Sequence, residues 1–491
     1  MFSVSIPIHL KEDTNKYDVL NILKRANAEY AFLAFDNIVL SADSEKYKKT
    51  FHIIKDIIPF LKENGYKVGV WFWSLWVADI VEQELNNVVM VNSEGKPRIA
   101  NAALNSTEKC LSGFLCPTSS KIQVMLDIIK HVAEYSPDII LLNDDLDYNT
   151  HLGSIGCYCN RHIAMIREKL GYNITKEELK SAVTSGKKNK IRDAWLEISG
   201  KTLEKYAIDV RNTINLVNTS IRCGFCAVMS NWQSDGINVE KYAKLLAGST
   251  KPFIRLIGAP YWAAGKSWGN RLQHTIELTR MESSWINDKN IDIVAEGDVY
   301  PRPRHRVPAS FLEIYDTALR ASGACNGILK IMLDYASSLG YETGYIERHE
   351  RNEKLYNKIN QIFKDKQSIG VRVYEYMNKA NDADFSGITY PEYYASNLLF
   401  SYAARFLSDN TVPTTYNGDN NVGIVFGENA RNIPQKALDN GLIIDIRAAR
   451  IFMEQGIDVG LESIEGNQLL AKILFFGNIA AWLVIIFGMN T

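Results

Sequence analysis

The chain has 491 residues, of which 46% are hydrophobic and 23% charged, a composition typical of a soluble globular protein with two or three domains. The formal net charge of −1 gives no electrostatic basis for binding nucleic acid or an anionic membrane surface. An odd number of cysteines, seven, and an N-terminal stretch unlike a signal peptide argue against a disulfide framework and favour a cytoplasmic protein.

Short apolar runs alternate with longer amphipathic stretches over residues 1–370, in the order strand, helix, strand. Such alternation is typical of parallel strand–helix–strand units. Eight units in succession favour an α/β fold of the closed (β/α)8 TIM barrel type over an open sheet. The predicted strands span residues 4–10, 30–36, 67–75, 138–143, 220–229, 252–258, 291–296 and 327–335, and helices are expected at 45–64 and 119–135.

Two further stretches add to the predicted barrel of residues 1–370, one within it and one after it. The charged stretch 175–218 predicts an extra pair of helices between strands four and five. Within residues 371–466, a helical pattern at 392–407, a strand pattern at 422–426 and a helical pattern at 445–455 predict a partial flavodoxin-like α/β domain.

The C-terminal segment 467–491 includes an almost wholly apolar stretch, 473–489. This stretch is at the lower limit of the length that spans a bilayer. Three interpretations stay open: a buried strand–helix segment of the α/β domain, a membrane anchor, or a truncated or aberrant chain end.

Side chains suited to a binding site end five of the eight predicted strands. In a TIM barrel the C-terminal ends of the strands carry the chemistry. Aromatic rings there can stack on sugars, as Trp262 after strand six can, although each ring also fits a core position. His305, in the arginine-rich loop after strand seven, can bind hydroxyl or phosphate groups. The strand-end residues are Asp36, Trp71, Trp73, Asp144, Asp145, Glu296 and Asp334.

Acidic residues at the ends of strands four and seven predict a glycosidase site. A retaining glycosidase uses two carboxyl groups roughly 5–5.5 Å apart, one as acid/base and one as nucleophile. Glu296 ends strand seven, while Asp144, Asp145 and Asp147 crowd the end of strand four, where mutual repulsion raises at least one pKa. The structural alternative is that these acids cap turns or pair with the arginines at 302, 304 and 306.

A compact group of cysteines and one histidine follows strand four. The pattern Cys157-x-Cys159-x-x-His162, with Cys116 contributed from before the preceding helix, predicts a closed Cys3His site. Four ligands of this type bind structural rather than catalytic zinc. Cys110 is a competing fourth ligand. The pattern at 223–226 also has the CxxC form, but it falls within a predicted strand and favours two core thiols.

Together these features resemble glycoside hydrolase family 42, the β-galactosidases of clan A. The resemblance implies a barrel with an acid/base glutamate after strand four and a nucleophile after strand seven, where Glu296 matches. It also implies a zinc knot of one upstream cysteine and C-x-C-x-x-C, which the cluster at 116, 157, 159 and 162 resembles with histidine in the last place. Residues 441–449 resemble part of the family's flavodoxin-like trimerisation domain, which implies a homotrimer.

The end of strand four departs from the family pattern. Where the family has Asn-Glu, this chain has Asp144-Asp145, so the resemblance assigns Asp145 to the acid/base position and Asp144 to the asparagine position. An aspartate carboxyl group lies about 1.5 Å further back than that of a glutamate on the same backbone. This departure indicates a divergent relative.

Three functions follow as hypotheses, all with a carbohydrate as partner. The first is a retaining glycoside hydrolase of β-galactosidase type, with Asp145 as acid/base and Glu296 as nucleophile. The second is a phosphorylase of the galactosyl-hexosamine type, in which phosphate attacks. The third is an inactive barrel that binds carbohydrate through Trp71, Trp73 and Trp262.

Overall fold

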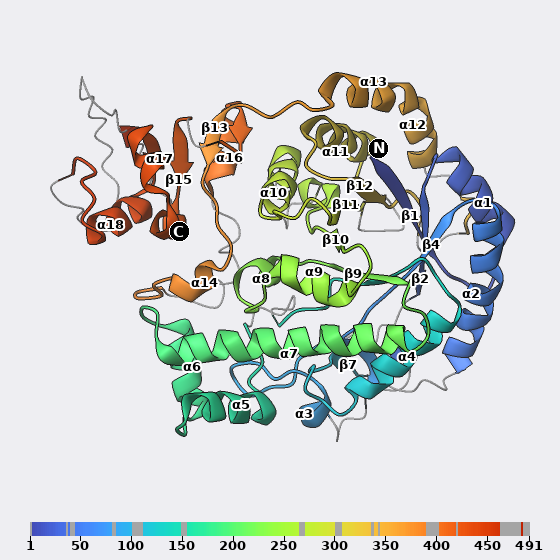
Figure 1. The fold of residues 1–491 in the computed structure, drawn as a ribbon, viewed down its shortest axis with the longest axis horizontal. Helices are drawn as coiled ribbons and strands as arrows, with labels where there is room; N and C mark the ends of the chain where they lie inside the picture. Colours follow the sequence, from blue (N-terminus) through green and yellow to red (C-terminus); the bar gives the residue numbers. More distant parts are fainter. Residues whose placement is uncertain are drawn as a thin grey trace.

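Eight parallel strands close into a barrel in the computed structural model of the protein (Figure 1). The structure describes residues 2–35, 38–39, 45–80, 85–100, 111–148, 155–264, 271–299, 307–334, 338–341, 344–388, 402–418, 421–461 and 483–484. The barrel strands are β1 (Ser3–His9), β2 (Tyr30–Phe35), β4 (Lys67–Phe72), β8 (Ile139–Leu142), β9 (Arg222–Cys226), β10 (Phe253–Arg255), β11 (Asp292–Gly297) and β12 (Gly327–Lys330).

The strands follow one another around the barrel in chain order, and β12 pairs with β1 to close it. Each of the eight overlaps one of the predicted strands, so the predicted TIM barrel is confirmed. β2 and β8 are buried along their whole length, and β4 nearly so, because side chains fill the lumen on one face and helices cover the other. This burial on both faces explains why the strands are almost continuously apolar.

Helices surround the barrel wall (Figure 1). The predicted helices at 45–64 and 119–135 correspond to α2 and α4. The helices of this layer are α1 (Lys16–Arg25), α2 (Glu45–Glu63), α4 (Ile122–Glu134), α8 (Met229–Gln233), α9 (Val239–Ala247), α10 (Leu272–Ser284), α11 (Ala309–Ser322), α12 (Tyr345–Arg351) and α13 (Glu353–Phe363), with a 3-10 turn, η2 (Pro260–Ala263).

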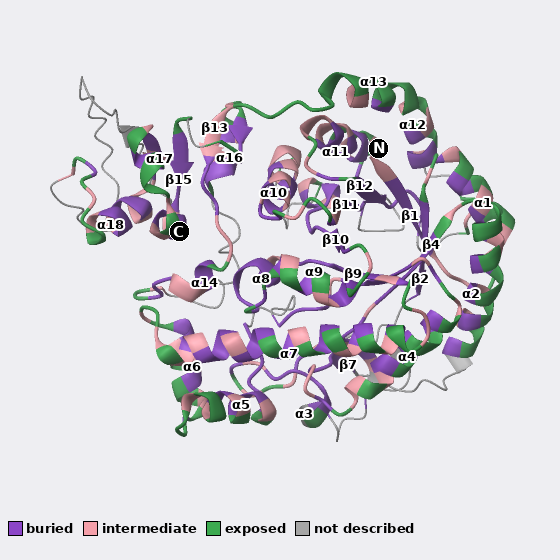
Figure 2. Ribbon diagram, viewed as in Figure 1, coloured by how far each residue is buried: buried purple, intermediate pink, exposed green. Residues whose placement is uncertain are grey.

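Two insertions enlarge the loops that follow the strands. Between β8 and β9 lie α5 (Asn160–Leu170), α6 (Lys176–Thr184) and α7 (Lys190–Asn215), of which α6 and α7 are the expected extra pair. Figure 2 shows buried and exposed residues alternating along α7, which runs along the barrel wall. The loops after β2 and β4, the second of which includes the helix α3 (Leu85–Val88), together form a side sheet. The sequence did not predict this sheet, because several of its strands are too short for a readable period. Its strands are β3 (Ile38–Val39), β5 (Trp76–Ile80), β6 (Ile99–Ala100) and β7 (Leu111–Phe114).

A second parallel sheet lies beside the barrel, and α16 (Tyr402–Asp409), a helix between its first two strands along the chain, contacts α10 (Figure 1). Numbered along the chain, its strands lie in the order 2-1-3-4-5, which is the flavodoxin-like order. The division of the chain at residue 370 stays a prediction; β13 begins at Val371. The elements are β13 (Val371–Val373), α14 (Lys379–Asp382), α16 (Tyr402–Asp409), β14 (Thr414–Thr415), β15 (Gly423–Val425), η3 (Gly427–Asn432), α17 (Gln435–Asp439), β16 (Leu442–Ile444), α18 (Ile446–Glu454) and β17 (Leu483–Val484).

The apolar C-terminal stretch lies outside the described residues except at β17. There it pairs in parallel with β16, as the interpretation of this stretch as part of the α/β domain requires. Within the part of the chain that the structure describes, none of the helices has the length and apolar character needed to cross a bilayer.

Candidate active site

Glu296 lies near the C-terminal end of β11 and faces the barrel lumen. Its neighbour Gly297 is in register with Lys330, whose side chain contacts Asp316 on α11 outside the barrel, so Glu296 must face the opposite way. Its Oε2 atom accepts a hydrogen bond of 3.1 Å from the backbone N–H of Gly258. Burial raises the pKa of Glu296 to about 7, although the nearby Arg255 acts to lower it.

Arg255, the last residue of β10, brings two carboxylates together. Its Nη1 atom lies 3.1 Å from Oε2 of Glu296 and its Nη2 atom lies 3.5 Å from Oδ2 of Asp144. The guanidinium is almost fully buried, and the side chain of Asp144 retains 19% of its exposure. The other carboxylate oxygen of Asp144, Oδ1, is buried and has no hydrogen-bond partner among the described residues. Acids from strands four and seven therefore meet at one guanidinium, as the predicted pairing of these strands requires.

Asp145 has a different environment. Both of its oxygens accept hydrogen bonds from the loop after β4: the backbone N–H groups of Ser74, Leu75 and Trp76 and the hydroxyl of Ser74. Burial raises the pKa of Asp145 to about 7, against the effect of these bonds. With all these donors satisfied by one carboxylate, the geometry favours an anchoring role for Asp145 and leaves Asp144 facing Glu296.

Asp147, the third acid of this loop, is buried away from the Asp144–Glu296 pair. The Ser230 hydroxyl lies 3.4 Å from its Oδ2 atom and 2.8 Å from Oδ2 of Asp235. Burial, together with the charge of Asp235, raises the pKa of Asp147 well above its ordinary value, and the pKa of Asp235 is raised to about 6 by burial. Asp147 and Asp235 thus form a buried carboxyl pair rather than part of the lumen site.

The predicted aromatic residues occupy different positions. Trp71 is buried, and its indole N–H donates a 2.9 Å hydrogen bond to Oδ1 of Asn143, directly before Asp144. Trp73 is partly buried, and its ring centre lies 5.5 Å from that of Trp76. Trp262 is buried in η2. Trp71 and Trp262 are buried, whereas Trp73 and its neighbour Trp76 are partly exposed, as stacking on a sugar requires.

Asp334, which follows β12, lines a cavity of about 250 Å³ at the C-terminal ends of β1 and β12, together with His9 and Lys11. This is the catalytic face of a TIM barrel. His9 also lies 6.1 Å, between ring centres, from Trp71. Two other predicted residues, Asp36 and His305, lie outside the described residues, as do the arginines at 302, 304 and 306.

The four predicted metal ligands gather in one buried cluster. The Sγ atom of Cys116 lies 4.0 Å from that of Cys157, 3.8 Å from that of Cys159 and 3.6 Å from Nδ1 of His162. Four tetrahedral ligands around zinc, with Zn–S bonds near 2.3 Å, place neighbouring sulfurs about 3.8 Å apart. The donor set and spacing therefore fit a structural zinc ion. Cys110 lies outside the described residues, and burial raises the pKa of both Cys223 and Cys226 to about 12, consistent with core thiols.

Another group of potential ligands, Glu313, Asp316 and His349, surrounds an ammonium group instead. Nζ of Lys330 lies 2.6 Å from a carboxylate oxygen of both Glu313 and Asp316 and 2.8 Å from Nδ1 of His349. Lys330 already supplies the positive charge that these carboxylates need. The cluster is a structural ion-pair network outside β12.

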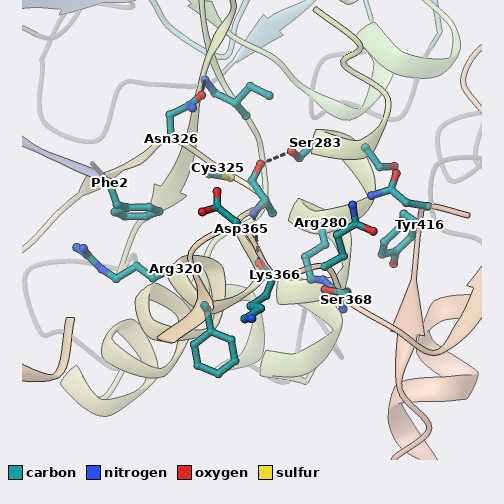
Figure 3. Close-up of a pocket in the computed structure, with 18 of the residues that line it drawn as sticks. Phe2, Arg280, Ser283, Arg320, Cys325, Asn326, Asp365, Lys366, Ser368 and Tyr416 are labelled. Atoms are coloured by element: carbon teal, nitrogen blue, oxygen red, sulfur yellow. Dashed lines mark hydrogen bonds between the residues drawn. The ribbon is translucent and has the colours of Figure 1, made fainter. Parts of the chain in front are cut away.

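A larger cavity, of about 1060 Å³, lies at the opposite end of the barrel. Figure 3 shows Phe2 and Asn326, which precede β1 and β12, on one side of it and Tyr416 of the second domain on another. Its place at the N-terminal ends of the strands, where TIM barrels do not carry their chemistry, separates it from the carboxylate pair.

The comparisons identify the fold. No protein-family model and no curated protein sequence matches the chain. Among solved structures, the β-galactosidase from Bacillus circulans sp. alkalophilus is similar over 90% of this chain and 71% of its own, with a TM-score of 0.58 and 11% identity. The β-galactosidase from the Antarctic haloarchaeon Halorubrum lacusprofundi covers 90% and 72%, with a TM-score of 0.57 and 10% identity. The β-galactosidase from Rahnella sp. R3 covers 90% and 70%, with a TM-score of 0.55 and 12% identity. The chain has the fold of these β-galactosidases, and the expected structural resemblance is confirmed.

One residue of the site, Arg255, was not expected from the sequence. Arg255 is the single charged residue in an apolar strand, and a buried charge at a strand end could have marked it as part of the site. Tyr261, which precedes Trp262 in η2, belongs to the same site: its pKa is raised well above the ordinary value by burial and by the charges of Glu296, Asp298 and Asp144. Tyr261 therefore lies beside the same carboxylates.

Proposed function

We propose that the protein is a retaining glycoside hydrolase, with Glu296 as the nucleophile and Asp144 as the acid/base. The observation that carries this proposal is the contact of both carboxylates with Arg255, at the C-terminal end of a barrel shared with β-galactosidases. Two carboxyl groups flanking one glycosidic bond are the machinery of this reaction. Asp144 takes the role that the family pattern assigns to Asp145.

The environments of the two carboxylates suit these roles. Glu296 accepts a hydrogen bond from the Gly258 N–H and faces the positive charge of Arg255. Both interactions stabilise the ionised form of Glu296, which attacks the anomeric carbon. Within the described residues Oδ1 of Asp144 has no hydrogen-bond partner, so this oxygen can donate a proton to the leaving oxygen and later take one from the attacking water. The shorter aspartate requires the substrate to sit deeper toward β8 than a glutamate would.

Turnover of a panel of aryl glycosides by the wild type and Glu296→Gln tests the proposal. We expect the variant to lose at least about a thousandfold in kcat while its thermal unfolding is preserved, because the amide cannot form the glycosyl–enzyme bond. Glu277→Gln is the matched control, since Glu277 pairs with Arg280 on α10 and should leave turnover intact.

Other outcomes separate the alternatives. Unchanged turnover by Glu296→Gln contradicts the proposed nucleophile. Turnover that requires added phosphate identifies a phosphorylase. Sugar binding without turnover of any glycoside in the panel identifies a carbohydrate-binding barrel.

A further inference from the structure

His162 faces the metal cluster with one ring nitrogen and the active-site loop with the other. Its Nδ1 atom lies 3.6 Å from Sγ of Cys116 and 3.2 Å from Sγ of Cys159. Its Nε2 atom lies 3.1 Å from the hydroxyl oxygen of Tyr148 and 3.3 Å from Oγ1 of Thr202. The imidazole therefore links the cluster to the loop after β8.

A cysteine at this position could not make the same link. A thiolate ligand coordinates through sulfur and has no hydrogen-bond donor left, whereas a metal-bound imidazole usually donates the N–H of its other ring nitrogen to a neighbouring group. When Nδ1 of His162 coordinates an ion, Nε2 carries the proton, and the hydroxyls of Tyr148 and Thr202 are within reach to accept it. Metal binding thus determines both the tautomer and the orientation of the ring.

Tyr148 is fully buried and tied to the loop that carries the carboxylates. Its backbone N–H donates a 3.2 Å hydrogen bond to Oδ1 of Asp235, and its carbonyl accepts one from Arg98. Between it and Asp144 the loop is anchored again, at Asp145. Because this segment is close-packed, a shift of the tyrosine is transmitted to the neighbouring carboxylates.

We propose that Tyr148 is a positioning residue that couples metal binding at the Cys116–Cys157–Cys159–His162 cluster to the geometry of the loop bearing Asp144. Without the metal, the ring of His162 is oriented by its hydrogen bonds alone, and the loop loses one of its fixed points. The effect on turnover rests on the proposed function, but the coupling between cluster and loop does not.

Hydrogen–deuterium exchange of a peptide covering residues 143–148 tests the coupling, with zinc bound and after chelation. In the wild type we expect chelation to speed exchange several-fold. In Tyr148→Phe, exchange should already be fast with zinc bound, so that chelation adds little. Tyr242→Phe is the matched control, because Tyr242 is equally buried, its hydroxyl has no hydrogen-bond partner within the described part of the chain, and it should behave as the wild type.

His162→Cys provides a second test in which the metal stays bound. This variant keeps four ligands but removes the imidazole, so it should bind one zinc ion and yet show fast loop exchange that responds little to chelation. The proposal would be overturned if chelation changed the exchange rate of this peptide equally in the wild type, Tyr148→Phe and His162→Cys. This holds also if the equal change came from unfolding of the whole loop.

Kinetics complete the experiment. With zinc bound, Tyr148→Phe and His162→Cys should lower kcat for an aryl glycoside about tenfold with little change in KM, since the loop positions the acid and not the sugar. If the wild type hydrolyses no glycoside, the proposed function fails while the exchange results still decide the coupling.

Discussion

The carboxylate of Glu296 lies 3.1 Å from the guanidinium of Arg255, and both side chains are shielded from solvent inside the barrel. Because the ionised form of Glu296 is the nucleophile and its pKa is raised to about 7 by burial, kcat/KM should rise with pH up to and through this value. Arg255→Met removes the charge that favours ionisation of Glu296. The acidic limb of the pH profile of kcat/KM should therefore move to higher pH by about one pH unit or more. The pH dependence of kcat/KM measures the shift.

Arg222→Met is the control for this experiment. Arg222 pairs with Asp292 at 2.7 Å near the start of β9, away from the carboxylate pair, so its loss should leave the acidic limb in place. An unmoved limb in Arg255→Met would contradict the role of this arginine.

Asp144 and Asp145 should respond differently to removal of their charge. Asp144→Asn removes the proposed acid/base and should lower kcat about 10² to 10⁴-fold with little change in stability. Asp145→Asn puts an amide against the N–H groups of Ser74, Leu75 and Trp76 and should lower the free energy of unfolding by about 1–3 kcal/mol. Kinetics and urea denaturation of both variants separate the roles, and the reverse pattern would restore Asp145 as the acid.

The cysteine cluster should contain metal. Elemental analysis of the purified protein is expected to find about one zinc ion per chain, as a closed four-ligand site requires. Cys157→Ser removes one ligand and should lose most of the zinc, whereas Cys223→Ser, at a buried thiol in β9, should retain it. Wild-type protein that is free of zinc and does not take it up would reduce the cluster to core thiols.

Lys330 should contribute to the stability of the fold, since it occupies the place that a metal ion would take among Glu313, Asp316 and His349. Lys330→Met leaves Glu313 buried without its cation and leaves Asp316 with Arg320 alone, which should cost about 3–5 kcal/mol in the free energy of unfolding. Lys205→Met, at a side chain with 74% exposure, should cost less than about 1 kcal/mol. Urea denaturation checks both, and equal losses would show that the buried network contributes no more than a surface pair.

The same network makes stability sensitive to acid. Burial acts to raise the pKa of Asp316, but Lys330 and Arg320 outweigh it and lower this pKa. The contribution of the ionised aspartate is therefore complete above its unfolded pKa of about 3.9 and is lost as the pH falls through the lower folded value. Denaturation at several pH values should show this loss in the wild type and a smaller one in Asp316→Asn.

The eight strands and three members of the cysteine–histidine cluster could be predicted because their signals are local. A buried parallel strand such as β2 is apolar along its length. Cys157, Cys159 and His162 lie close together in the sequence, immediately before and within the first turn of α5. The short strands of the side sheet, such as β3, could not be predicted, because two residues are too few to show a period.

The sequence by itself therefore determined the barrel, the order of its strands, the cysteine–histidine cluster and the acidic residues at the ends of strands four and seven. Only the tertiary structure decided which of three neighbouring aspartates faces Glu296. That choice depends on Arg255 from β10 and on backbone amides of the loop after β4, which lie more than sixty residues from Asp144 and Asp145 along the chain. Hydrogen bonds and ion pairs over such separations form only when the barrel closes, so no local pattern encodes them.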